Sequence, residues 1–183
     1  GLGDYENGMI ASGAVLQYLY ETQKNDLSHL TKITPYTTGQ FMMIDTSTRR
    51  NLELVETLRE KQKRGSLLWV LDKTKTAMGA RLLRSFIEQP LIDKEEIERR
   101  QQAIEELNMN YISREEIREY LNSVYDLERL MGRISYKTAN PRDLLSFKNS
   151  LEMLPYIKDI LGEFSCELLK KMNEDLDPLR DLY

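Results

Sequence analysis

The chain has few side chains suited to nucleophilic or metal chemistry. His29 is the only histidine and Cys166 the only cysteine among 183 residues. A zinc site needs several such ligands close together, and a catalytic triad needs a histidine or lysine base beside its nucleophile. Nothing around His29 marks it for either role, so we expect it on a surface or in a loop, with general-base chemistry as the remaining option. Cys166 is expected to be a packing residue near a helix.

Phosphate-binding loops and paired carboxylates are the next possibilities. Neither GxxxxGK[ST] nor GxGxxG after a strand occurs, so no nucleotide should bind in either of those ways. Adjacent acidic pairs occur at Glu95-Glu96, Glu105-Glu106 and Glu115-Glu116. Neighbours on a helix point about 100° apart, which favours solvated helix faces over an acid–base dyad. The sequence therefore predicts no catalytic, cofactor-binding or metal-binding residue in this chain.

The middle of the chain is basic. The net charge is −4, but residues 49–84 hold ten basic and four acidic side chains, net +6. Such a stretch can attract phosphate, although the negative total counts against a free-standing nucleic-acid domain. The candidate contacts to a DNA backbone are Lys61, Lys63, Arg64, Lys73 and Lys75. A solvated helix face explains the same charges. Trp69, the one aromatic side chain among them, is expected in the core rather than stacked on a base.

The elements that position these residues are expected to be mainly α-helical. A helix is predicted over residues 8–23, and FMMID indicates a short β element near residues 40–46. We expect this element to pair with another segment, inside or outside this chain. From residue 48 onward, apolar residues recur at the spacing of a helix. A helix over residues 48–58 should place Leu52, Val55 and Leu58 on one of its faces.

Four later helices have recognisable starts. The predicted N-caps are Asp93, Ser113, Asp126 and Asn140. Behind Asp93, the expected buried seam holds Ile97, Ile104 and Leu107. Pro155 should interrupt the last of these helices.

The stretch at 66–91, SLLWVLDKTKTAMGARLLRSFIEQPL, predicts a joint between packed elements. Its helix should begin after Thr76 and end near Gln89, because Pro90 disfavours the α region at the residue before it. Gly79 lies in the first turn, where a glycine lets another backbone approach closely. Arg81 and Arg84 lie at the edges of the apolar face, suited to snorkelling or to pairing with an acid.

Several blocks of this chain occur in a characteristic order and spacing. They are IDTSTRRNLEL at 44–54, the 66–91 stretch, IERRQQAIEEL at 97–107, YDLERLMGRI at 125–134 and TANPRDLLSFKNSLEMLP at 138–155. Together they resemble the core (lever, domain III) region of the MutS family of bacterial DNA mismatch-repair proteins. LQYLYETQKNDLSHL at 16–30 is similar to the segment that leads from the family's connector domain into the core.

The resemblance implies a domain plan. Residues 1–26 would lead from the connector into the core, and residues 27–183 would be the first core segment, ending near the clamp insertion. In this family the full-length protein is an ATPase that uses ATP and Mg, acts on mismatched double-stranded DNA and forms a homodimer. It would be cytoplasmic and associated with the nucleoid. The mismatch-reading and nucleotide-binding motifs lie outside this region, so no catalytic residue or cofactor carries over, and no membrane partner is implied.

Three interpretations follow, the first of them with a variant. The first is a non-catalytic core segment that links the ATPase to the DNA-binding parts. A variant makes the parent a divergent paralogue without the mismatch-reading domain. The second is a DNA-backbone-binding module that uses residues 49–84, and its signature would be binding that weakens steeply with salt. The third is a small helical enzyme with a carboxylate site, which predicts a concave pocket and perturbed Glu or Asp pKa values.

Overall fold

A computed structural model describes residues 5–22, 27, 30, 32–33 and 38–182 of the chain. The chain divides into two compact units, Gly1–Gly39 and Gln40–Tyr183, and each is described by itself. The described element of the first unit is α1 (Glu6–Thr22), which confirms the helix predicted over residues 8–23. His29 lies outside the described residues. The domain boundary predicted after residue 26 stays a prediction.

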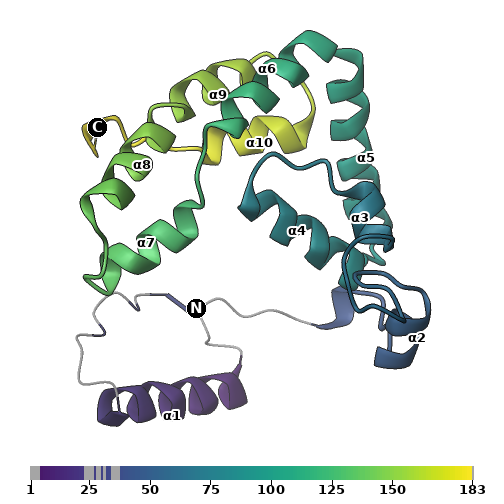
Figure 1. The fold of residues 1–183 in the computed structure, drawn as a ribbon, viewed down its shortest axis with the longest axis vertical. Helices are drawn as coiled ribbons and strands as arrows, with labels where there is room; N and C mark the ends of the chain where they lie inside the picture. Colours follow the sequence, from purple (N-terminus) through teal and green to yellow (C-terminus); the bar gives the residue numbers. More distant parts are fainter. Residues whose placement is uncertain (1–4, 23–26, 28–29, 31, 34–37, 183) are drawn as a thin grey trace. The chain divides into compact units, whose positions relative to one another are not determined.

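The second unit is built from helices, as the sequence predicted (Figure 1). A short 3-10 helix, η1 (Thr38–Gln40), spans the boundary between the two units in the sequence, and a second one, η2 (Arg180–Leu182), belongs to the second unit. The α-helices are α2 (Thr46–Asn51), α3 (Leu67–Leu71), α4 (Ala77–Glu88), α5 (Lys94–Met109), α6 (Tyr111–Asn122), α7 (Leu127–Ser135), α8 (Pro141–Leu151), α9 (Leu154–Leu161) and α10 (Glu167–Asp175).

The predicted β element near residues 40–46 is a single antiparallel bridge between Phe41 and Leu91. The Met42 N–H donates to the Pro90 carbonyl at 2.8 Å, and the Ile92 N–H donates to the Gln40 carbonyl at 3.3 Å. The partner is thus within the chain. The bridge joins the two ends of the segment that holds α2, α3 and α4, and we call this segment, residues 41–92, the arm.

The arm has a small core of its own. Leu54, Ser66 and Leu68 are buried, and the Leu68 N–H donates to the Leu54 carbonyl at 2.9 Å. Arg49 reaches from α2 to the Glu88 carbonyl at the end of α4, at 3.4 Å. These contacts and the bridge at its base make the arm a closed structural segment.

A second and larger core joins α5, α6, α9 and α10, which we call the body. Ala103, Ile160, Phe164 and Leu169 form its buried cluster. The partly buried side chains packed against this cluster are Leu107, Ile117, Tyr120, Leu161, Cys166 and Leu168. Every member of the cluster comes from the four body helices or from the segment between α9 and α10. Figure 1 shows α10 beside α5 and α9 beside α6, in agreement with these contacts.

Most of the predicted helix starts are confirmed. The side chains of Thr76, Asp93, Asp126 and Asn140 each accept a hydrogen bond from the backbone N–H three residues on, and Asn140 forms a full capping box with Asp143. Helix α4 ends at Glu88, before Pro90, as expected. The interruption at Pro155 is also confirmed, because α8 ends at Leu151 and α9 begins at Leu154.

Two helix predictions were wrong. The helix expected over residues 48–58 ends at Asn51, because Glu53 adopts φ +49° and turns the chain toward α3. Leu54 is buried in place of Leu52 and Leu58, which are both exposed. Ser113 is not an N-cap, because α6 already begins at Tyr111. Its hydroxyl instead donates to Glu163 Oε2 at 2.9 Å.

Two core predictions missed by one residue. Trp69 was expected in the core but is 48% exposed, while its neighbour Leu68 is 4% exposed. Ile104 was expected in the α5 seam but is 58% exposed, while Ala103 is buried against α9 and α10. In both cases the larger side chain was assigned to the interior. The methyl group of Ala103 allows close helix packing that isoleucine would prevent.

Candidate functional site: the contact between α4 and α7

The start of α4 is fixed by its own preceding loop. Thr76 Oγ1 accepts the Gly79 N–H at 3.0 Å. A Cβ at Gly79 would lie 3.1 Å from Thr76 Oγ1 and 3.5 Å from the Cβ of Thr74. The close approach at Gly79 therefore comes from side chains of the same segment, and not from the backbone of another element as we expected.

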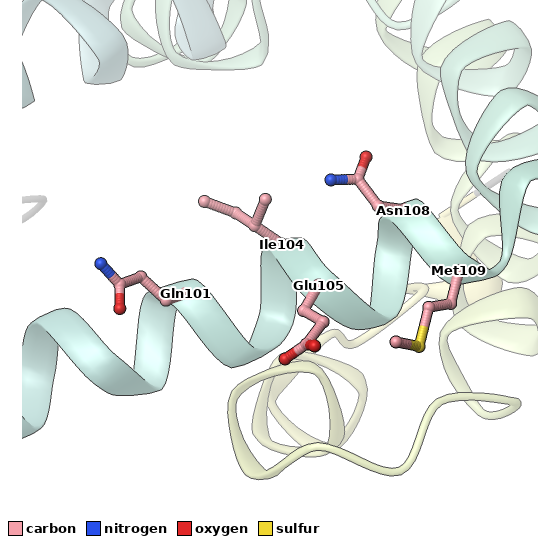
Figure 2. A pocket seen from close by; sticks show the side chains of 5 residues that line it. All are labelled: Gln101, Ile104, Glu105, Asn108 and Met109. Atoms are coloured by element: carbon pink, nitrogen blue, oxygen red, sulfur yellow. The ribbon is translucent and has the colours of Figure 1, made fainter.

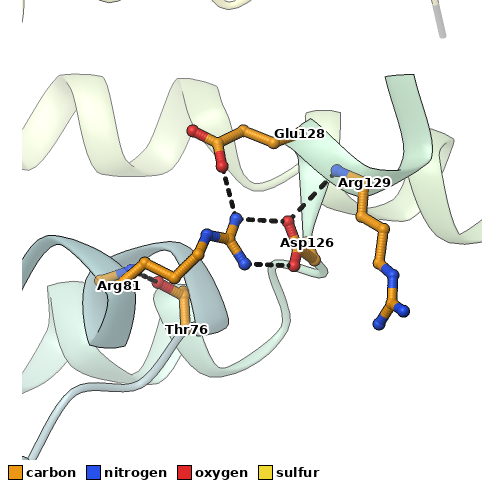
Figure 3. Close-up of polar contacts among 6 residues, drawn as sticks. Thr76, Arg81, Asp126, Glu128 and Arg129 are labelled. Atoms are coloured by element: carbon orange, nitrogen blue, oxygen red, sulfur yellow. Dashed lines mark hydrogen bonds and ion pairs between the residues drawn. The ribbon is translucent and has the colours of Figure 1, made fainter. Parts of the chain in front are cut away.

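Arg81 connects α4 to the beginning of α7 (Figure 3). Its Nη1 donates to Asp126 Oδ2 at 2.7 Å and its Nη2 to Asp126 Oδ1 at 2.8 Å. The same Nη2 also donates to Glu128. A guanidinium that meets both oxygens of one carboxylate fixes orientation as well as distance, which a lysine cannot do. Arg81 thus ties two helices that are 45 residues apart in sequence.

Asp126 serves both helices at once. Its Oδ1 also accepts the Arg129 N–H at 3.3 Å, which caps α7. The hydrogen bonds that Arg81 donates to Asp126 are the main cause that lowers the pKa of Asp126, and the same bonds raise the pKa of Arg81. The Asp126 side chain is 19% exposed and the Arg81 side chain 50% exposed. The ion pair is therefore half open to solvent.

A buried serine holds the residue before Asp126. The Tyr125 N–H donates to Ser150 Oγ at 3.0 Å, and this hydroxyl donates to the Ser146 carbonyl at 2.7 Å. Ser150 is fully buried. The start of α7 is thereby tied to α8, so the carboxylate that Arg81 meets is held from both sides.

Two more arginines join the arm to the body. The guanidinium of Arg100, on α5, lies 3.9 Å from the ring centre of Phe86 on α4. Arg118, on α6, donates to the Lys73 carbonyl at 3.3 Å. Arg84, by contrast, pairs with Glu88 at 3.2 Å within α4 itself. Of the two arginines singled out from the sequence, Arg81 makes a contact between elements and Arg84 makes a local one.

The candidate DNA-backbone contacts lie in two loops of the arm. Lys63 forms an ion pair with Asp72, and hydrogen bonds from Lys63 and Thr74 lower the pKa of Asp72 to about 2. Lys61, Arg64 and Lys73 are exposed, and Lys75 is half-buried. The structure brings Lys63 to the α3 end of the 72–76 loop. A DNA-binding role for the five residues stays a prediction.

The acidic pairs do not form a dyad among the described residues, but Glu106 has a role that the sequence did not indicate. Its Oε1 accepts the Ser165 N–H at 2.6 Å and the Ser165 hydroxyl at 2.7 Å, and its Oε2 accepts the Cys166 N–H at 2.8 Å. These bonds lower the pKa of Glu106 to about 2. Glu106 thus holds the start of α10 from α5, where the Cys166 side chain at the N-cap position accepts no capping hydrogen bond. Such a partner 59 residues away leaves no local signal.

The carboxylate-enzyme interpretation gains no support from the described part of the chain. The resolved carboxyl pKa shifts, at Asp45, Asp72, Glu106, Asp126 and Asp143, are all downward. A general acid near neutral pH needs the opposite shift. Hydrogen bonds that hold a carboxylate ionised are instead typical of caps and ion pairs.

The described surface has several open hollows. One of about 510 Å³ is lined by Gln101, Ile104, Glu105, Asn108 and Met109. Figure 2 shows that these five side chains all project from α5. Within the described residues, no cluster of three or more His, Cys, Asp or Glu side chains could hold a metal ion. No helix among them is long and apolar enough to cross a membrane.

Comparison with known proteins places this helical chain in a family. The family model described as MutS domain III matches residues 47–182. DNA mismatch repair protein MutS of Lachnoclostridium phytofermentans is 69% identical over 182 residues, which cover 100% of this chain and 20% of that protein. The MutS of Ruminiclostridium cellulolyticum is 52% identical over 179 residues, 98% of this chain and 20% of the relative. The MutS of Clostridium novyi is 55% identical over 169 residues, 92% of this chain and 19% of the relative.

The chain spans about one fifth of the length of these curated relatives. The family match covers the nine α-helices described in the second unit, apart from the first residue of α2. The chain therefore belongs to the MutS domain III family of DNA mismatch-repair proteins.

Proposed function

We propose that this chain is the non-catalytic core segment of a MutS-like mismatch-repair ATPase, and that it links the nucleotide-binding part to the DNA-binding parts. In this proposal ATP and Mg are bound elsewhere in the full-length homodimer, which acts on mismatched double-stranded DNA at the bacterial nucleoid. The partners of this chain are then the other domains of the same protein.

One observation carries the proposal beyond family membership. The arm and the body have separate cores. Arg100 and Arg118 contact the arm from the body, and Arg81 ties the arm to the start of α7. A segment that transmits a change between distant sites needs parts that stay internally rigid and can shift relative to one another. The closed arm and the packed body, each with buried residues of its own, support such a role.

A substitution in the body core tests the proposal in a full-length MutS protein that carries this segment. Ala103→Leu would overpack the contact of α5 with α9 and α10. We expect the ATPase rate without DNA to stay near the parent value, while its change on adding a mismatched duplex falls. Ile104→Ala, on the exposed side of the same helix, is the matched control and should leave both rates unchanged. A folded Ala103→Leu protein with the full response to DNA would refute a linking role.

Binding of this segment to the DNA backbone is the second candidate. The exposed Lys61 and Arg64 favour it, because they make no ion pair in the described part of the chain while Lys63 does. Fluorescence anisotropy of the chain with matched and mismatched duplexes tests it at low and physiological salt. Under the main proposal neither duplex binds. Equal, salt-sensitive binding that Lys61→Gln and Arg64→Gln weaken together would instead establish a phosphate contact.

A further inference from the structure

We propose that the guanidinium of Arg81, held by Asp126 and Glu128, is a latch that fixes α4 against the start of α7, and that its release lets the arm turn relative to the helices behind it. The latch is a property of this chain. Its use in signalling between nucleotide and DNA rests on the function proposed above.

The position of Arg81 supports a latch over a general packing contact. The hollow at this contact is lined by Arg81, Asp126, Glu128 and Arg129, all of them charged. No residue of α4 falls in the fully buried class. The contact between α4 and α7 at this point is therefore polar, and breaking it removes ion pairs without opening a hydrophobic core.

The geometry also explains why the latch holds the arm in one defined position relative to α7. Arg81 meets both oxygens of Asp126, so a rotation of α4 loses one bond before the helices separate. Asp126 is held in turn through the α7 cap and through the Tyr125–Ser150 hydrogen bond. One arm position therefore satisfies all of these bonds together, and a displaced arm leaves the Asp126 carboxylate with its cap alone.

The covalent connections of the arm allow a turning motion. The arm joins α5 through Leu91–Asp93, directly after the Phe41–Leu91 bridge that closes its base. Arg100 on α5 contacts the Phe86 ring of the arm, and Arg118 on α6 donates to the Lys73 carbonyl of the arm. Neither of these contacts pairs a cation with a carboxylate, whereas Arg81 forms ion pairs with Asp126 and Glu128.

Substitutions can remove the ion pair of the latch while the helices around it stay folded. Asp126→Asn removes the charge that pairs with Arg81 but keeps an N-cap oxygen, because asparagine caps helices as well as aspartate does. Arg81→Gln removes the other partner. Arg84→Gln is the matched control, because it breaks an ion pair of the same helix that is local to α4. If Arg81→Gln failed to fold, Asp126→Asn would still test the latch.

The readout is a distance between α4 and α8 in the 183-residue chain. Ser85 and Asn149 are exposed positions on these helices, and each takes a spin label as a cysteine in a Cys166→Ser background. Double electron–electron resonance then gives the distribution of distances between the labels. Circular dichroism confirms that each variant is folded.

We expect one narrow distribution in the parent and in Arg84→Gln. Arg81→Gln and Asp126→Asn should each broaden or shift it, and the double variant should match the single ones because both remove the same contact. High salt should broaden the parent distribution and leave the variants unchanged. A narrow, unshifted distribution in folded Arg81→Gln and Asp126→Asn would overturn the latch. If the distribution responds as expected while the ATPase response of the full-length variants to mismatched DNA is unchanged, the latch stands and the proposed linking function fails.

Discussion

Ser150→Ala is the substitution whose effect the structure defines most closely. Ser150 is fully buried, and its hydroxyl is the acceptor for the Tyr125 N–H and a donor to the Ser146 carbonyl. Alanine fits the same space but leaves the Tyr125 N–H without its partner. A buried donor that loses its acceptor costs about 1–3 kcal/mol. We therefore expect Ser150→Ala to lower the free energy of unfolding by about 2 kcal/mol.

Urea unfolding followed by circular dichroism measures this loss. The midpoint should fall while the slope m stays constant, because the surface exposed on unfolding hardly changes. In a thermal melt, about 2 kcal/mol corresponds to a drop in Tm of roughly 4–8 °C for a chain of this size.

The control is Ser85→Ala on α4. Its hydroxyl also donates to a carbonyl of the same helix, that of Leu82 at 2.7 Å, but it is exposed and accepts no long-range bond. Its effect should stay within about 0.5 kcal/mol. If Ser150→Ala were equally neutral, the Tyr125–Ser150 bond would not hold the start of α7, and the argument for a fixed Asp126 would lose its support.

Two further predictions concern backbone conformation and pH. Gly65→Ala should destabilise the chain by roughly 1–3 kcal/mol, because Gly65 has φ +96° and a Cβ would lie 3.2 Å from Thr57 Cγ2. Gly132→Ala should instead stabilise it by about 0.5–1 kcal/mol, because this helical glycine has no neighbour within 4 Å of an added Cβ; urea midpoints compare the two, and the same sign for both would contradict the reasoning. The pKa of Glu106 is lowered from 4.5 to about 2, so the stability from its cap is present above pH 4.5 and is lost as the pH falls toward 2. Glu106→Gln should remove this part of the acid dependence of the urea midpoint, whereas Glu105→Gln should keep the parent profile.

The sequence predicted the local elements well, because their signals are local. The caps at Thr76, Asp93 and Asn140 and the break at Pro155 act within one or two helical turns. Short apolar runs were less informative. All five residues of LLWVL are apolar, so the sequence does not show which of them face the interior. The choice of Leu68 over Trp69 as the buried side chain depends on the backbone pairing of α3 with Leu54, which no periodicity reveals.

The candidate site was only partly accessible to sequence analysis. The sequence suited Arg81 to snorkelling or to pairing with an acid, and it identified no partner. Asp126 was identified only as a helix cap, and its second role depends on how α4 and α7 meet. Glu106 was grouped with solvated pairs for the same reason, because its partners lie at the start of α10. Tertiary contacts between charged side chains, unlike caps, have no fixed spacing in the sequence.

The body is held by buried apolar side chains, and the arm is held to α7 by an ion pair. The difference in free energy between these two kinds of contact determines which part of the chain should move first. Each fully buried apolar side chain of the body contributes about 1.5–3 kcal/mol, and Ile160, Phe164 and Leu169 are all buried there. Ion pairs that are half open to solvent, such as that of Arg81, contribute less net free energy, although a bidentate pair fixes the relative orientation of its two partners. A perturbation too small to open the body can therefore release α4 from α7. The arm can then shift as a closed segment while both cores persist, which is the behaviour that a linking element requires.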